Sequence, residues 1–397
     1  SSSDFIHCHN NVGGLGMPEL CAEKDIFTIS TWYQLLTSKD PTVKGLAWKE
    51  IEDYANKAKV PQKRDAEYDI NSGNCQHFLN WCTRDDGVAL RKETSGANRR
   101  VSSLLKALAK LGCSIKKDKE NHLQLLVGTI PVNGNITQTL RGVYRTRRAA
   151  NWLDEQSGQH MNLAQKAREG NWWISRQDFI TEKDYIFACK VRVNALPCPT
   201  NLVKWKVETN KKCPLCNHPN CTQKHILSGC DALLTQYQKR HDHMVKVMKK
   251  MLEDNCYSTV FREKTMPNST LRPDLTVPEG KARGVFLDVG VTASDLFNVG
   301  IPHVFKNKYK KYGNAKGIRI DGDKESVSKE TFRFVPLLFT STGLYKPSLF
   351  RDLVNTFKMK PKTAQYMLRK LSALSIKGSR FVWMSYARAA AAIKNRN

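Results

Sequence analysis

The chain has 397 residues, and 64 lysines and arginines against 37 aspartates and glutamates give it a formal net charge of +27. A chain of this length buries a full core and is expected to hold two or more domains. The positive charge favours a polyanionic partner, nucleic acid first, through electrostatic steering and counterion release. No stretch of eighteen apolar residues occurs, so we expect no membrane partner, and acidic lipid surfaces are the weaker alternative.

Cysteine usage favours metal binding over disulfides. The opening segment SSSDFIHCHNNVGG lacks the charged and apolar regions of a signal peptide, so we expect a reducing compartment. Among the twelve cysteines, five crowd into about thirty residues, which is typical of a metal site. These five are Cys198, Cys213, Cys216, Cys221 and Cys230. We expect the remaining cysteines to be free thiols.

Residues 1–127 are predicted to form a mainly helical domain. The clearest helix lies in NRRVSSLLKALAKLG, where Gly112 supplies a stop signal. Its apolar side chains recur at helical spacing: Val101, Leu104, Leu105, Leu108 and Leu111. The basic side chains lie mainly off this stripe, and they form either a solvated polar face or a phosphate contact.

Residues 128–206 are predicted to form a second helical domain. Pro197 and Pro199 stop its last helix, because proline lacks the backbone donor that a helix interior needs. Trp172, Trp173 and Trp205 lie within this segment. Core packing is the default role for such large side chains, and base stacking is the alternative.

Residues 207–232 carry the spacing of a zinc knuckle. In CPLCNHPNCTQKHILSGC, two residues separate Cys213 from Cys216, eight separate Cys216 from His225, and four separate His225 from Cys230. Thiolates and an imidazole at such short spacing suit tetrahedral zinc, in a segment too short to have a core of its own. We predict a zinc site from these four residues.

Two neighbours leave the ligand set open, because either His218 or Cys221 can replace a member of the quartet. A chance grouping of unligated side chains is the remaining alternative. Four protein ligands leave no open position for water, so the predicted zinc is structural. Its role is to fix a rigid basic module beside the next domain.

Residues 233–360 show the order helix, strand, strand, helix, strand, which predicts a small α/β fold with a covered sheet. Residues 361–397 are predicted to form basic helices. The fold class expected for the whole chain is therefore α+β, with several domains and mainly helical segments ahead of the α/β core.

Two aspartates stand out within this α/β segment, in LRPDLTVPEGKARGVFLDVGV. If Asp274–Val277 and Gly284–Asp288 are the arms of an antiparallel hairpin, Asp274 directly faces Asp288. The two Cα atoms are then about 4.5–5.5 Å apart. Two like charges at this separation are unfavourable unless a cation lies between them, so the pair predicts a Mg²⁺ or Mn²⁺ site for phosphodiester hydrolysis.

A structural interpretation competes with this one. Asp274 follows Pro273 and can cap a turn, while Asp288 can pair with a lysine or an arginine. A buried, unpaired carboxylate costs several kcal/mol, so Asp288 needs a partner in either case.

Further charged residues lie close to the aspartates in the sequence. In HVFKNKYKKYGN, Lys308, Lys311 and Tyr312 share one helical face and can point together at a phosphate, although most such lysines are solvated. Residues 240–242 bring together a guanidinium, an imidazole and a carboxylate: Arg240, His241 and Asp242. Adjacent helix positions diverge by about 100°, so we expect one of these to enter the site while the others contact backbone or solvent.

The order of these motifs resembles the C-terminal half of the polyprotein of non-LTR retrotransposons of the restriction-like-endonuclease class, which insert at specific sites. The upstream segment NNVGGLGMPEL resembles the passage from that family's reverse transcriptase into its thumb. DYIFACKVRVNALPCPTNLVKW resembles its linker. The resemblance makes residues 1–127 thumb-like, residues 128–206 a linker, and residues 233–360 an endonuclease core of the PD-(D/E)xK type with a mixed sheet.

The resemblance implies a Mg²⁺-dependent nuclease that nicks double-stranded target DNA, so that the freed 3′ end primes reverse transcription of the element RNA. Asp274 and Asp288 match the family's metal-binding acids, and Lys308 with Tyr312 match its basic and aromatic helix residues. The family's remaining matched residues are the triplet Arg240, His241 and Asp242 and the knuckle Cys213, Cys216, His225 and Cys230.

The sequence departs from the wider pattern at two places. Gly290 stands where the superfamily usually has a lysine, two residues after the second acid, so a helix lysine such as Lys308 is needed instead. Lys306 and Lys311 are the alternatives. The only Asp-Asp pair, Asp85-Asp86, lies in the turn-like CTRDDGVAL, so we expect no polymerase palm in this chain.

The function expected from these observations is metal-dependent DNA nicking for target-primed reverse transcription, in the nucleus. Mg²⁺ or Mn²⁺ is the expected catalytic cofactor and Zn²⁺ the structural one. A nucleic-acid-binding protein with an inactive nuclease fold is the alternative, and a zinc-containing RNA-binding accessory of a polymerase is a third.

Overall fold

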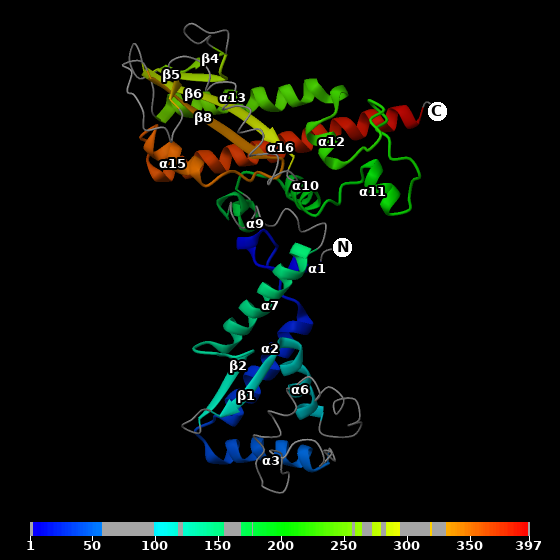
Figure 1. Ribbon diagram of the computed structural model, residues 1–397, viewed down its shortest axis with the longest axis vertical. Helices are drawn as coiled ribbons and strands as arrows, with labels where there is room; N and C mark the ends of the chain where they lie inside the picture. The colour runs from blue at the N-terminus through cyan, green and yellow to red at the C-terminus, as the bar shows by residue number, and fades with distance from the viewer. Residues whose placement is uncertain are drawn as a thin grey trace. The chain divides into compact units, whose positions relative to one another are not determined.

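The computed structural model describes residues 3–57, 99–117, 122–154, 168–176, 178–255, 259–263, 272–278, 283–293, 318–319 and 331–395. Two compact units are present (Figure 1). One is Gly16–Arg148, and the other combines Ser1–Leu15 with Ala149–Asn397. Both contain helices and a small sheet, in agreement with the expected α+β class.

The Gly16–Arg148 unit packs helices against an antiparallel sheet. Its helices are α2 (Leu20–Leu36), α3 (Pro41–Lys57), α6 (Arg99–Leu111) and most of α7 (Ile136–Asp154), and its strands are β1 (Cys113–Lys117), β2 (Leu123–Val127) and β3 (Ile130–Pro131). The predicted apolar stripe of α6 is buried, and it packs against Trp32 of α2 and Ile115 of β1. Gly112 follows α6 with φ of +58°, as predicted for its stop signal.

The second unit is mainly helical before its sheet. Its early elements are α1 (Ser3–His7), η1 (Asn10–Val12), η4 (Arg168–Asn171), α9 (Trp172–Ser175), α10 (Glu182–Arg192), α11 (Pro199–Lys204), α12 (Gln223–Ser228), η5 (Asp231–Leu233) and α13 (Leu234–Asn255). Trp172 and Trp173 are buried, as core packing requires, whereas Trp205 is 45% exposed, so the core-packing default is wrong for it. The indole N–H groups of Trp172 and Trp173 donate to Ser372 Oγ at 3.0 Å and to the carbonyl of Thr342 at 3.1 Å.

One buried arginine joins the first residues of the chain to this unit. Arg192 of α10 donates to the carbonyl of Gly13 at 3.2 Å and to Asn171 Oδ1 at 2.7 Å, and its guanidinium stacks over the ring of Trp173. A Cβ on Gly14 would lie only 2.2 Å from Cys8 Sγ, so this close approach requires glycine. The Gly-Gly-Leu-Gly segment is thus held by packing in the second unit as far as Leu15.

A five-stranded mixed sheet and two helices complete this unit. The elements are β4 (Phe261–Arg262), β5 (Leu275–Pro278), β6 (Arg283–Thr292), β7 (Ile318–Arg319), β8 (Thr331–Thr340), α15 (Ser348–Asn355) and α16 (Pro361–Lys394), and the strand order is β4-β5-β6-β8-β7. β5 and β6 are antiparallel, with Leu275 opposite Leu287 and Val277 opposite Val285. The predicted hairpin register is confirmed. β6 and β8 are parallel, so the sheet is mixed as expected.

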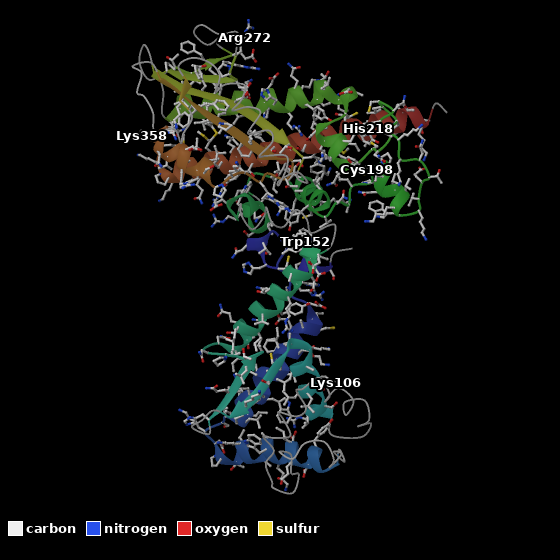
Figure 2. All side chains as sticks on the ribbon, viewed as in Figure 1. Lys106, Trp152, Cys198, His218, Arg272 and Lys358 are labelled. Carbon is white, nitrogen blue, oxygen red and sulfur yellow. The ribbon has the colours of Figure 1, made fainter. Side chains whose placement is uncertain are left out.

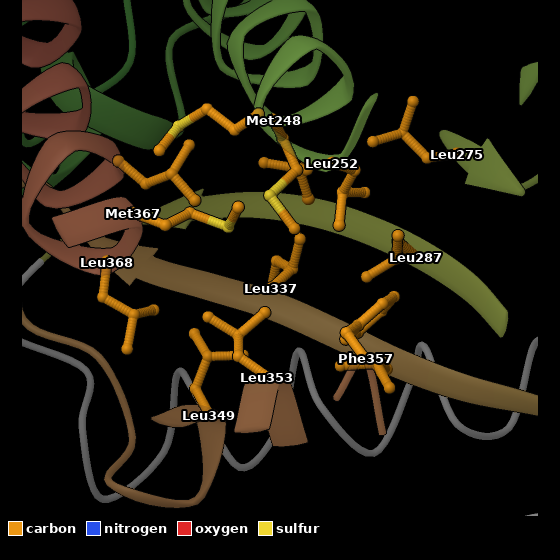
Figure 3. Close-up of a cluster of buried hydrophobic side chains, with 14 of the residues drawn as sticks. Met248, Leu252, Leu275, Leu287, Leu337, Leu349, Leu353, Phe357, Met367 and Leu368 are labelled. Atoms are coloured by element: carbon orange, nitrogen blue, oxygen red, sulfur yellow. The ribbon is translucent and has the colours of Figure 1, made fainter. Parts of the chain in front are cut away.

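The core of the sheet is shared with three helices (Figure 3). Met248 and Leu252 of α13, Leu353 of α15 and Met367 of α16 gather around Leu337 of β8. All five side chains are buried, and each contributes roughly 1.5–3 kcal/mol relative to an exposed position. The C-terminal helix is therefore part of the core of the α/β fold.

The expected five segments, 1–127, 128–206, 207–232, 233–360 and 361–397, have bounds different from those of the two compact units. The difference arises from long-range packing. Helix α16 packs against the sheet, α12 and α10, and the first fifteen residues belong to the same compact unit as Ala149–Asn397. The five-part division stays a prediction. Among the described residues, no helix is both long and apolar enough to cross a membrane.

Two candidate metal centres

The knuckle between α11 and α13 is shaped by local backbone hydrogen bonds. Cys213 begins a tight turn in which its carbonyl accepts from the backbone N–H of Asn217 at 2.9 Å, and Asn217 has φ of +60°. Thr222 then caps α12, its hydroxyl accepting from the backbone N–H of His225 at 3.1 Å. The turn at Cys213 and the helix cap at Thr222 place the Cys-x-x-Cys segment beside the helix that carries His225.

The four predicted zinc ligands come together in this knuckle. Cys213 Sγ lies 3.9 Å from Cys230 Sγ, Cys230 Sγ lies 3.6 Å from Cys216 Sγ, and Cys216 Sγ lies 3.3 Å from His225 Nε2. A tetrahedron built on zinc–sulfur bonds of about 2.3 Å has sulfur–sulfur edges of about 3.8 Å. The spacing of the donor atoms therefore fits one tetrahedral ion, and this Cys3His group can bind a metal such as zinc.

The two alternative ligands lie outside this group. His218 Nδ1 is 3.1 Å from the carbonyl of Asn220, and its ring, labelled in Figure 2, stacks on the ring of His225 at 4.5 Å. Cys221 Sγ lies 3.4 Å from the hydroxyl of Tyr386 on α16. Burial raises the pKa of the Cys221 thiol and so favours its neutral form. The geometry thus favours the quartet over either substitution.

The protonation of His225 also suits a metal ligand. Burial and the neighbouring His218 lower the pKa of His225 from its ordinary value. A lowered pKa favours the neutral imidazole, which is the form that donates a lone pair to a metal.

The knuckle is fastened to α13 and α16 by two side chains. The hydroxyl of Tyr237 accepts from the backbone N–H of Cys230 at 3.0 Å and donates to the carbonyl of Ile226 at 2.8 Å. Arg240 is buried and donates to the carbonyl of Leu227 at 3.1 Å and to Ser379 Oγ at 3.1 Å. Arg240 therefore joins α12, α13 and α16, and its side chain serves packing between these helices.

The second candidate centre lies where β5 and β6 begin to pair. His241, Asp274 and Asp288 each offer one ligand atom, and these atoms lie within 4.8 Å of one another. Asp274 precedes β5 directly, and the register of the hairpin carries it opposite Asp288 of β6. Asp288 is buried at 5% exposure, and Asp274 is partly buried. The opposed aspartates predicted from the hairpin are thus found together, with an imidazole beside them.

Asp274 is held by two donors. Its Oδ2 accepts from the backbone N–H of Val289 at 2.6 Å and lies 2.9 Å from His241 Nε2. The hydrogen bond to Asp274 raises the pKa of His241 above its ordinary value. Although burial alone opposes ionisation of Asp274, the hydrogen bonds from His241 and its other neighbours lower its pKa. The pair therefore favours an imidazolium beside a carboxylate.

The Arg-His-Asp triplet divides as expected of adjacent helix positions. His241 reaches the aspartates, Arg240 contacts backbone, and Asp242 Oδ1 accepts from Arg262 at 2.9 Å at a partly exposed site. His241 Nδ1 lies 3.3 Å from Asp242 Oδ1, so this imidazole stands between two carboxylates.

No family is shown for this chain. A scan against protein-family models found no match, and neither did a search of curated proteins. What the chain does therefore has to be argued from the two centres and the surfaces around them.

Several predicted residues fall outside the part of the chain that the structure describes. Lys308 and Tyr312 do so, as do the alternatives Lys306 and Lys311 and the Asp85-Asp86 pair. Their roles stay predictions. Gly290 is described, and it lies in β6 opposite Leu338 of β8.

Sequence reasoning missed the side chains that hold the two centres in place. Tyr237 was not singled out, although it lies three residues before Arg240 and so shares its helix face. Tyr386 and Ser379 also escaped notice, because their contacts with the knuckle and with Arg240 cross more than a hundred residues. Arg262, the second residue of β4, had no local signal.

Proposed function

We propose that this protein is a metal-dependent DNA endonuclease. The observation that carries the proposal is the juxtaposition of Asp274 and Asp288 at neighbouring strands, with His241 hydrogen-bonded to Asp274 beside them. Two partly or fully buried carboxylates side by side are costly without a cation. In a chain of net charge +27, the substrate that suits such a centre is a polyanion.

The residues divide the work as follows. Asp274 and Asp288 supply hard oxygen ligands for Mg²⁺ or Mn²⁺, and the N–H of Val289 fixes the orientation of the Asp274 carboxylate. These two carboxylates would hold the cation, whose chemistry would be to activate water and offset charge on the scissile phosphate. His241 Nε2 lies 2.9 Å from the same carboxylate oxygen and so also positions Asp274, and Asp242 in turn orients His241. A lysine of the 303–314 segment, with Lys308 first, is expected to stabilise the extra charge of the transition state.

The zinc knuckle has a structural role in this proposal. Its four ligands complete a tetrahedron, so no coordination position remains for water or substrate. Arg240, the residue before His241, donates a hydrogen bond to α12. A folded knuckle therefore also fixes the part of α13 from which His241 reaches Asp274.

The biological setting rests on the resemblance of the motif order to site-specific non-LTR retrotransposons. On that basis we propose that the nick primes reverse transcription of element RNA in the nucleus. The polymerase that such a reaction requires would be another part of a longer polyprotein or a separate chain.

One observation favours a second candidate, a nucleic-acid-binding protein that no longer cleaves. His241 already partners Asp274 through a 2.9 Å hydrogen bond, which partly compensates the carboxylate charge without a cation. Gly290 also replaces the usual lysine. In this case the chain binds DNA or RNA across Mg²⁺ and Mn²⁺ titrations and cuts neither.

Nicking of supercoiled plasmid by the full chain separates the two candidates. We expect conversion to the open circle only with added Mg²⁺ or Mn²⁺, and a loss of at least about 100-fold in Asp288→Asn, because the substitution keeps the shape and removes the ligand charge. Asp254→Asn, which changes an exposed carboxylate at the end of α13, is the matched control and should nick normally.

DNA affinity is measured in parallel by gel shift. Retained affinity with lost nicking in Asp288→Asn supports the proposal. Equal nicking by wild type and Asp288→Asn would overturn the assignment, and binding without any nicking by the wild type would establish the second candidate.

A further inference from the structure

The outer face of α16 carries aromatic, basic and methionine side chains along one line, half-buried at Lys370 and exposed at the other positions. Its members recur at helical spacing: Tyr366, Lys370, Lys377, Phe381, Met384 and Arg388. Tyr366 is 48% exposed and Phe381 46%, in a helix whose opposite face lies in the core. Single exposed apolar residues are common on protein surfaces, but a contiguous row of exposed aromatic side chains is typical of a binding surface.

A groove opens beside this line. Its volume is about 320 Å³, and its lining comes from the segment before α10 and from two turns of α16. The lining residues are Asp178, Phe179, Ile180, Thr181, Lys370, Ala373, Leu374 and Lys377. Four of the lining residues are apolar, and both lysines come from α16. A volume at the small end of the range for ligand sites suits one planar ring.

Aromatic rings lead from the core into the groove. Phe179 meets buried Trp172 edge to face at 5.7 Å and exposed Tyr366 at 5.3 Å. Lys370 Nζ lies 5.7 Å from the centre of the Tyr366 ring. Packing against Trp172 fixes Phe179, so the groove offers a preformed aromatic wall beside an ammonium group.

The charges around the groove favour an anion. Among the described residues, neither Lys370 nor Lys377 has a carboxylate partner. The two lie seven residues apart, or about 10 Å along the helix. Asp184, by contrast, is neutralised by Arg380 at 3.3 Å and by the capping hydrogen bonds of Thr181. The N-terminal turn of α10 is therefore already satisfied, and among the described residues that line the groove Asp178 is the one carboxylate.

We propose that this groove and the α16 line bind single-stranded nucleic acid, with an unpaired base packed against Phe179 and Tyr366 and the flanking phosphates at Lys370 and Lys377. A base inside a duplex cannot present its face to these rings, whereas an unpaired base can. Two lysines beside an aromatic surface complement phosphate charge and base faces together, which favours a nucleic-acid strand over a protein partner. The proposal stands apart from the carboxylate centre, since neither Asp274 nor Asp288 takes part in it.

Fluorescence anisotropy with the full chain and no added Mg²⁺ tests this directly. The probes are fluorescein-labelled dT15, U15 and a 15-base-pair duplex. Tyr366→Leu is expected to weaken single-strand binding by about fivefold or more, the lower range for loss of one stacked base, and duplex binding by less than twofold. Tyr366→Phe should bind as the wild type does, because it keeps the ring. Tighter binding of dT15 or of U15 identifies the source of the strand as DNA or RNA.

A charge-matched pair controls for general electrostatics. Lys377→Gln should reduce the slope of log affinity against log salt for dT15 by about one, whereas Lys250→Gln, an exposed lysine of α13, should leave it unchanged. The proposal is wrong if Tyr366→Leu binds single strands as tightly as wild type, if it weakens duplex binding equally, or if no single strand binds at all.

Photocrosslinking keeps the test valid even if a variant folds poorly, because it uses the wild-type chain. A 15-mer with a central 5-iodouracil is irradiated in the complex, and the modified peptide is identified by mass spectrometry. We expect adducts at Phe179 or Tyr366. Adducts confined to peptides outside residues 172–181 and 361–388 would overturn the assignment.

Discussion

Gly378 and Arg240 meet so closely that the helix crossing of α13 and α16 depends on the absence of a side chain. A Cβ at position 378 would lie 2.5 Å from Arg240 Cγ and 3.0 Å from its Cδ. These atoms lie near the root of a buried side chain, and Arg240 is also bound to Leu227 and Ser379. The side chain therefore has little room to move away.

We accordingly expect Gly378→Ala to destabilise the protein by about 1–3 kcal/mol, through overpacking and loss of hydrogen bonds from Arg240. Urea denaturation measures the change. Gly142→Ala in α7, where an added Cβ meets nothing within 4 Å, is the control and should be neutral or stabilising by up to about 1 kcal/mol. Equal effects of the two substitutions would show that the close approach is unimportant.

The two stacked histidines of the knuckle have different predicted roles. His225 Nε2 lies 3.3 Å from Cys216 Sγ within the Cys3His group, whereas His218 lies outside it. His225→Ala should therefore lose one equivalent of zinc, measured by atomic absorption, and expose residues 207–232 to protease. His218→Ala should keep its zinc. Normal zinc content in His225→Ala would contradict the ligand assignment.

At the scale of elements, the β5–β6 hairpin was predictable because pairing in a sheet has a fixed period. In a hairpin the register is fixed by the loop, so arms at Asp274–Val277 and Gly284–Asp288 place Asp274 opposite Asp288. The sequence could not predict which residue of the 240–242 triplet enters the site. That choice depends on the rotation of α13, which is set by distant contacts with α16.

The knuckle shows the same division between local and distant information. Cysteine and histidine spacing predicted a zinc site and favoured the quartet, but the fold was needed to place His218 and Cys221 outside the ligand group. The attachment of the knuckle to the rest of the unit could not be predicted, because Tyr386 approaches Cys221 from 165 residues away. The groove beside Phe179 could not be predicted from the sequence either, because its lining comes from α16 and from residues 178–181, which are far apart in the chain.

At the scale of the molecule, zinc should stabilise one compact unit and not the other. The knuckle shares a buried cluster with Val382 and Tyr386 of α16, and α16 shares the core of the sheet. The unit Gly16–Arg148 has a separate core around α2 and α6. Loss of zinc therefore removes folding free energy from the unit that contains α16.

Differential scanning calorimetry before and after treatment with a zinc chelator tests this expectation. We expect one transition to fall by at least about 10 °C and a second, from Gly16–Arg148, to stay within about 2 °C. An equal fall of both transitions, or a single transition that zinc removal leaves in place, would contradict it.

The central claim is that a divalent cation is shared by Asp274 and Asp288. Electron paramagnetic resonance of Mn²⁺, titrated into the zinc-loaded chain without nucleic acid, measures its occupation directly. We predict one Mn²⁺ per chain in the wild type and in Asp254→Asn, and at least about tenfold weaker binding in Asp288→Asn. Equal Mn²⁺ affinity in Asp288→Asn and wild type, or no bound Mn²⁺ in the wild type, would contradict the assignment.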